Sequence, residues 1–115
     1  MIYDLEERTA KFGENVIKLC QTVQITEITK SIVNQLIRAA TSIGANYMEA
    51  NQSSSNKDFR NKIKIAQKEA NESKHWLRML AIAYQVKIQE CRVLWKEAHE
   101  LTLILASISR KCQAK

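Results

Sequence analysis

Apolar residues recur along most of this chain at alternating spacings of four and three, the pattern of one buried face on an α-helix. The first such stretch covers about residues 4–21 and carries Leu5, Thr9, Phe12, Val16 and Leu19. The same period returns over about residues 26–51 and 56–84, and again beyond residue 88. The pattern predicts four helices of similar length and therefore an all-α fold.

Breaks in the pattern predict where these helices begin and end. Thr26 precedes the second periodic stretch and Ser55 the third, and both are residue types that cap helix N-termini. Residues 51–56, NQSSSN, form the clearest loop, and a shift of the apolar face places the last turn near residues 85–88. Four similar helices joined by short turns bury their stripes best as an antiparallel up-and-down bundle. We expect residues 1–115 to form one domain.

The stripe centres predict the core. Leu36, Ile43, Leu77, Leu101 and Leu105 are expected to pack together, because they occupy the centres of three stripes.

A polar group also falls on this predicted core. Asn46 lies on the stripe of the second helix, so burial would require a hydrogen-bond partner for its amide. Its neighbours Arg38 and Glu49, or a facing helix, are candidate partners. The sequence therefore predicts a buried polar set of Arg38, Asn46 and Glu49.

Composition agrees with helices and gives an expectation for location. The chain has 115 residues, no proline and two glycines. No apolar run approaches the roughly 20 residues of a membrane span, and the N-terminal MIYDLEERTA does not resemble a signal peptide. We expect a cytoplasmic protein without membrane contact. Cys20, Cys91 and Cys112 are widely spaced and are predicted to be buried free thiols.

Catalytic and metal-binding signatures are weak. Glu72 and His75 form one Glu-x-x-His pair, but di-metal bundles need two copies, and Lys96 occupies the matching position before His99. The sequence offers no glycine-rich phosphate loop or Ser-His-Asp order. We therefore expect no metal, no cofactor and no enzymatic activity, with a surface position for His75.

Positive charge concentrates on the third predicted helix. The net charge is +6, and basic residues outnumber acidic ones over residues 57–78. The candidate nucleic-acid contacts are Lys57, Arg60, Lys64, Lys68, Lys74 and Arg78. These residues form either an ordinary solvated face or a surface for phosphate groups. No aromatic residue is interleaved with them on this helix, so base stacking is not indicated.

The third helix also carries more apolar residues than one stripe can bury. Met79, Ile82 and Val86 fall opposite its core positions, Trp76 lies on a flank, and Trp95 lies off the stripe of the next helix. A wide core stripe is one explanation. We favour an interface between subunits, formed by Trp76, Met79, Ile82, Val86 and Trp95.

The segment SIVNQLIRAATSIGANYMEA, followed by KDFRNKIKIAQKEANESKHWLRML, resembles a family of bacterial four-helix bundle proteins. The family includes proteins encoded in intervening sequences of 23S rRNA genes and is related to the accessory protein of diversity-generating retroelements. The resemblance implies an up-and-down bundle that assembles as a homo-oligomer, with a pentamer as the first expectation, and no assigned enzymatic activity. For the retroelement relatives it implies contacts with nucleic acid and a reverse transcriptase.

Together, these observations suggest a non-enzymatic homo-oligomer that binds RNA, DNA or a ribonucleoprotein through the basic side of its third helix. The alternative is a protein-protein interaction scaffold without a nucleic-acid role. A di-metal enzyme is a third class, which stoichiometric bound metal would indicate.

Overall fold

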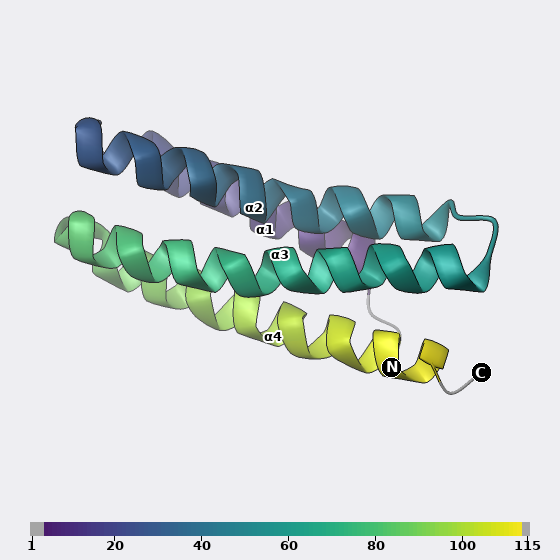
Figure 1. Cartoon of the computed structure of the whole chain (residues 1–115). Coiled ribbons are helices and arrows are strands. Elements are labelled where there is room, and N and C mark those ends of the chain that lie inside the picture. Colours follow the sequence, from purple (N-terminus) through teal and green to yellow (C-terminus); the bar gives the residue numbers. More distant parts are fainter. Residues whose placement is uncertain (1–3, 114–115) are drawn as a thin grey trace.

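The computed structural model describes residues 4–113 and contains four long α-helices, which confirms the all-α bundle. These are α1 (Leu5–Gln21), α2 (Glu27–Asn51), α3 (Asn56–Ala83) and α4 (Ile88–Gln113), with the short 3₁₀ helix η1 (Gln85–Lys87) before α4. Successive helices run in opposite directions along an elongated molecule of 47 × 25 × 19 Å (Figure 1). The predicted last turn at residues 85–88 thus matches η1 within one residue.

Side-chain caps explain why the helices begin where they do. The Asp4 carboxylate accepts a hydrogen bond from Glu7 N at 3.0 Å. Thr26 and Thr29 exchange side-chain to backbone bonds in a capping box, and Ser55 accepts from Asp58 N at 3.0 Å. Thr26 and Ser55 are therefore the N-caps that the sequence predicts.

The core lies along the centre of the bundle and draws on all four helices. Leu36, Ile43, Leu77, Leu101 and Leu105 are fully buried in one cluster, as predicted. The interfaces of α3 with α2 and with α4 are the most extensive, whereas α1 meets α4 over a much smaller surface. The α1–α4 seam is consequently the most open side of the bundle.

The predicted buried polar set is wrong. Arg38 and Glu49 are exposed, and Asn46 is half-buried with its amide donating to Ser42 O of its own helix at 2.8 Å. The core side of α2 passes through Val33, Leu36, Ala39, Ala40, Ile43 and Ala50 instead. Arg38 and Glu49 lie at the outer edge of the α2–α3 seam, where their charged groups stay hydrated while pairing with α3.

α1 and α2 approach each other closely at Gly13 and Gly44, most tightly at Gly44. A Cβ atom built at Gly13 would lie 3.6 Å from Thr41 Cα, and one at Gly44 would lie 3.2 Å from Thr9 Oγ1. The two helices therefore meet almost backbone to backbone at this crossing.

Candidate nucleic-acid interface

The acidic residues in the middle of α3 face α2, where Arg38 pairs with them. Its guanidinium group bonds to Glu69 at 3.1 Å and to Glu72 at a shorter distance. The hydrogen bond from Arg38 lowers the pKa of Glu72, whereas burial raises the pKa of the neighbouring Glu69. The carboxylates of Glu69 and Glu72 therefore lie on the side of α3 that faces α2.

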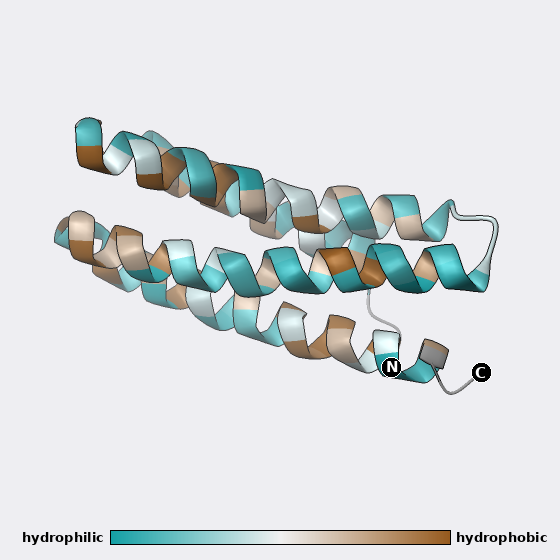
Figure 2. Ribbon diagram, viewed as in Figure 1, coloured by the Kyte–Doolittle hydropathy of each residue, from teal (hydrophilic) through white to brown (hydrophobic). Residues whose placement is uncertain are grey.

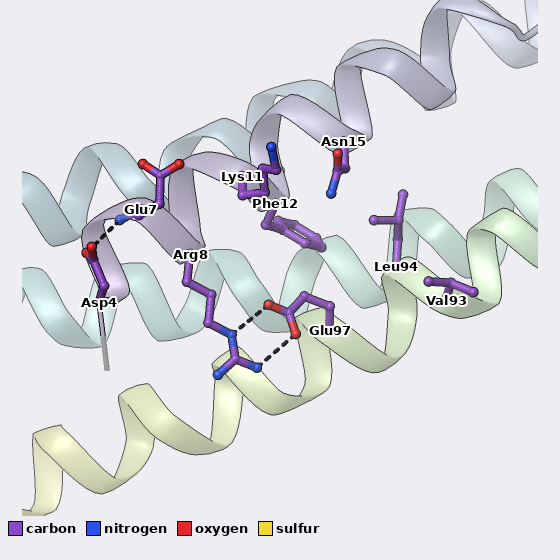
Figure 3. Close-up of a pocket in the computed structure, with 9 residues that line it drawn as sticks. All are labelled: Asp4, Glu7, Arg8, Lys11, Phe12, Asn15, Val93, Leu94 and Glu97. Atoms are coloured by element: carbon purple, nitrogen blue, oxygen red, sulfur yellow. Dashed lines mark hydrogen bonds and ion pairs between the residues drawn. The ribbon is translucent and has the colours of Figure 1, made fainter. Parts of the chain in front are cut away.

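The acidic residues of α4 face α1 in the same way. Arg8 Nε and Nη2 donate to the two oxygens of Glu97 at 2.7 and 2.8 Å (Figure 3). Arg8 Nη2 also donates to Glu100 at 3.0 Å. These carboxylates raise the pKa of Arg8. Glu90 pairs with Lys87 near the start of α4. Sequence patterns do not reveal the Arg8 contacts, because these join residues far apart in the chain.

The side shared by α3 and α4 retains positive charge. Arg60 and Lys64 precede Lys74 and Arg78 by 14 residues each, which is four helical turns and returns to the same side. On α4, Arg92 lines one pocket with Arg78, and Lys96 follows Arg92 by about one helical turn and is exposed. We define the basic face by its cations Arg60, Lys64, Lys74, Arg78, Arg92 and Lys96. Within residues 4–113 none of these cations forms an ion pair with a carboxylate.

The structure divides the predicted nucleic-acid contacts between two sides of α3. Arg60, Lys64, Lys74 and Arg78 belong to the basic face. Lys57 and Lys68 are exposed on the outward side, with Lys68 close enough to Glu72 to help lower the pKa of that carboxyl. Figure 2 shows that the ribbon of α3 is hydrophilic over much of its length, with a hydrophobic stretch in its first half and another at its C-terminal end.

Two aromatic rings of α4 lie within the basic face. The Trp95 and His99 rings stack with centroids 5.3 Å apart and an interplanar angle of 14°. Lys74 Nζ lies 3.1 Å from His99 Nδ1 and 5.3 Å from the Trp95 ring centroid. The prediction considered aromatic residues of the third helix alone, whereas the rings beside the basic residues come from the neighbouring helix α4.

A pocket of about 400 Å³ opens beside Trp95 between the end of α3 and the start of α4. Its lining is apolar at Leu77, Ala81 and Ile88, and Arg78 and Arg92 contribute cationic groups. The lining contains no aspartate or glutamate. An apolar cavity that offers guanidinium groups and an indole ring is suited to a flat ligand that carries negative charge.

The residues predicted for a subunit interface differ in how far they are exposed. Trp76 is half-buried and packs against the core. Met79 and Trp95 line the pocket with Ile82, while Ile82 and Val86 are the most exposed members, at 68% and 77%. Only Ile82 and Val86 are thus mainly open to solvent.

A second groove follows the open α1–α4 seam. One part, of about 370 Å³, is lined by Phe12, Val93 and Leu94 beside the Arg8–Glu97 pair (Figure 3). An adjoining part of about 440 Å³ shares Asn15, Val93 and Leu94 and continues to the end of α1. Both charge signs line this groove, so it has no preference for polyanions.

The two residues considered for metal binding, Glu72 and His75, both belong to α3 but have different surroundings. Glu72 is paired with Arg38, and His75 is exposed. Within residues 4–113 there is no group of three or more histidine, cysteine, aspartate or glutamate side chains placed to hold a metal ion. Over the same residues, no helix combines the length and apolar character needed to span a membrane.

Comparison with known proteins places the chain in a family. Residues 3–107 match the 23S rRNA-intervening sequence protein family. The fold is similar to the crystal structure of a protein of unknown function from the S23 ribosomal protein family of Bacteroides thetaiotaomicron, with a TM-score of 0.77 and 30% identity, over 90% of this chain and 96% of that one. No curated protein matches the chain. No enzymatic activity is indicated for this family or for the protein in that crystal structure. The chain therefore belongs to the 23S rRNA-intervening sequence protein family.

Proposed function

We propose that this protein is a non-enzymatic, homo-oligomeric bundle that binds nucleic acid through phosphate contacts on its basic face. The observation that carries the proposal is the segregation of charge. Carboxylates of α3 and α4 pair with Arg38 and Arg8 on the outer seams, and the side between α3 and α4 keeps its cations unneutralised. Such a surface attracts a polyanion without requiring a particular base sequence.

RNA is the polyanion to test first, because the name of the family refers to 23S rRNA. If all six cations of the basic face contact phosphates, the logarithm of the binding constant should fall with the logarithm of salt concentration, with a slope of about −4 for single strands. A smaller number of contacts gives a proportionally smaller slope.

A charge-reversal pair tests the proposal against non-specific attraction. Lys64→Glu with Arg92→Glu removes two cations from the basic face, and Lys11→Glu with Lys30→Glu removes two exposed cations elsewhere. The two variants have equal net charge. We expect only the first to lose most RNA affinity in fluorescence anisotropy and to show a flatter salt dependence. Equal affinities for both variants would refute binding at this face.

Self-association is the second part of the proposal. The exposed side chains of Ile82 and Val86 lie where α3 ends and η1 begins, at the same end of the bundle as the start of α2. There Ile25 and Ile28 are also exposed, at 56% and 68%. Contact with another subunit would remove these apolar side chains from water and is therefore favourable. Repetition of the basic face around a ring would combine weak phosphate contacts into avid binding.

Light scattering measures this part directly. Ile28→Glu with Val86→Glu should lower the molar mass from that of an oligomer, with a pentamer as the first expectation, and should weaken RNA binding. Met48→Glu with Ile65→Glu is the matched control, because it places two charges at other exposed apolar positions. Unchanged mass in the Ile28/Val86 variant would place any interface elsewhere.

The alternative function, a protein-protein interaction scaffold, is favoured by the α1–α4 groove. Its exposed Val93 and the neighbouring Leu94 and Phe12 provide an apolar floor bordered by charged residues of both signs. If the wild-type protein fails to bind RNA at low salt, the scaffold becomes the better explanation. In that case Val93→Glu should disrupt partner binding without altering the fold.

A further inference from the structure

We propose that the pocket beside Trp95 receives an unpaired base of a single-stranded nucleic acid, whose phosphates are held by Arg78 and Arg92. This inference rests on the proposed nucleic-acid function and adds to it the class of nucleic acid. With such a pocket, the protein recognises unstacked nucleotides as well as the phosphate backbone of a duplex.

The chemistry of the lining selects the ligand. An apolar cavity alone would suit any hydrophobic group, but Arg78 and Arg92 contribute guanidinium groups to this one and no carboxylate opposes them. The ligand must therefore combine a flat, weakly polar ring with negative charge. A nucleotide has both features, and guanidinium groups suit it because they pair with phosphate and stack on bases.

Trp95 is already held in place for stacking. His99 stacks on its ring, Lys74 is anchored on His99, and the side chain nevertheless keeps 37% of its surface exposed. Because His99 and Lys74 already contact the Trp95 ring, it loses little conformational freedom when a base stacks on its exposed part. Ordered aromatic platforms among cations are the common device for binding single strands.

The pocket is large enough for one base. Its volume of about 400 Å³ is near the lower end for small-ligand pockets, which suits one base with part of its sugar. A base inside a duplex is stacked and paired and cannot reach such a cavity without being flipped out. The pocket should therefore favour single strands over duplexes, while the rest of the basic face binds both.

The test compares an unstructured 12-nucleotide RNA, the same RNA with abasic sugars, and a duplex, using fluorescence anisotropy at one salt concentration. We expect the intact single strand to bind roughly tenfold more tightly than the abasic strand. Trp95→Ala should remove this difference and leave duplex and abasic binding and the salt slope unchanged. Trp95→Phe should retain part of it, and Trp76→Phe all of it, because Trp76 packs against the core.

Tryptophan fluorescence tests whether the base contacts Trp95. In a Trp76→Phe background Trp95 is the only tryptophan, and its emission should be quenched by the intact single strand but not by the abasic one. Single-stranded DNA of the same sequence should also quench it, since stacking needs no 2′-hydroxyl group. Failure of the DNA to quench would overturn the stacking mechanism.

The outcomes separate this inference from the proposed function. If the abasic strand and the intact strand bind equally well to the wild-type protein, the base pocket is refuted while phosphate binding stands. If Trp95→Ala lowers the molar mass of the assembly, the pocket belongs to a subunit interface and the inference is overturned. If none of the nucleic acids binds, both proposals fail together.

Discussion

Alanine substitution of the two glycines is expected to have different effects, because the facing helix lies closer to Gly44 than to Gly13. Both glycines lie inside helices and neither has a positive φ, so alanine fits the backbone at both positions. Alanine is better than glycine in a helix interior by about 1 kcal/mol. At Gly13 a Cβ would lie in ordinary contact, 3.6 Å from Thr41 Cα and Cγ2. Gly13→Ala should therefore raise the free energy of unfolding by about 1 kcal/mol.

Gly44→Ala meets a fixed obstacle. Its Cβ would lie 3.2 Å from Thr9 Oγ1, and that hydroxyl group donates to Leu5 O at 2.7 Å. The Thr9 side chain must shift by a few tenths of an ångström or give up its bond, and a hydrogen bond is worth about 1 kcal/mol. The helix-propensity gain should be cancelled, so that Gly44→Ala is neutral or destabilises by up to about 1 kcal/mol.

A double-mutant cycle isolates this clash. In a Thr9→Ala background the nearest remaining atoms of residue 9 are its carbonyl carbon and Cβ, both 3.5 Å away, so Gly44→Ala should now stabilise by about 1 kcal/mol. Urea unfolding followed by circular dichroism on the four proteins gives the coupling energy. A coupling below about 0.3 kcal/mol, the usual error of additivity, would show that the helices do not meet as described. Equal stabilisation by Gly13→Ala and Gly44→Ala would refute the argument as well.

Three further predictions concern the core, the α1–α4 seam and the cysteines. Leu101→Ala should lower the free energy of unfolding, measured with urea, by about 2 to 5 kcal/mol, since Leu101 is fully buried. A loss near zero would contradict its place in the core. Arg8→Ala should lower the free energy of unfolding by about 1 to 2 kcal/mol. Arg8→Lys should lose part of this stability too, because lysine lacks the planar pair of donors that bonds to Glu97. A lysine variant as stable as the wild type would count against the paired geometry. Burial raises the pKa of Cys20 and Cys91 to about 11, so at neutral pH a thiol reagent should modify the half-buried Cys112 first and the other two only after unfolding; rapid modification of all three would show that the core is open.

The fold could be predicted because its determinants are local. The cap at Thr26 and the spacing of apolar residues act within a few turns of one helix, so a single sequence reveals them. Asn46 shows the limit of this approach. A helical stripe is wide enough that a residue at its edge can be core or seam, and only the position of the neighbouring helix decides which.

The candidate site could be predicted only in part. The basic residues of α3 are visible as a charge excess on one helix, but the aromatic platform comes from Trp95 and His99 of α4. Equally, Arg8 holds the carboxylate of Glu97 on the α1 side of α4, away from the basic face, and these two residues are 89 positions apart in the sequence. Such juxtapositions follow from how the helices pack, and no pattern along one helix contains them.

The order of the helices also has a consequence for how fast this chain folds. Its extensive interfaces join consecutive helices, and the α2–α3 connection spans only residues 52–55. Native contacts are therefore close in sequence, which favours folding within milliseconds or faster. During synthesis the α2–α3 hairpin can form before α4 has left the ribosome, whereas the Arg8–Glu97 pair must await most of the chain. Mutations at Arg8 should consequently accelerate unfolding while leaving the folding rate almost unchanged.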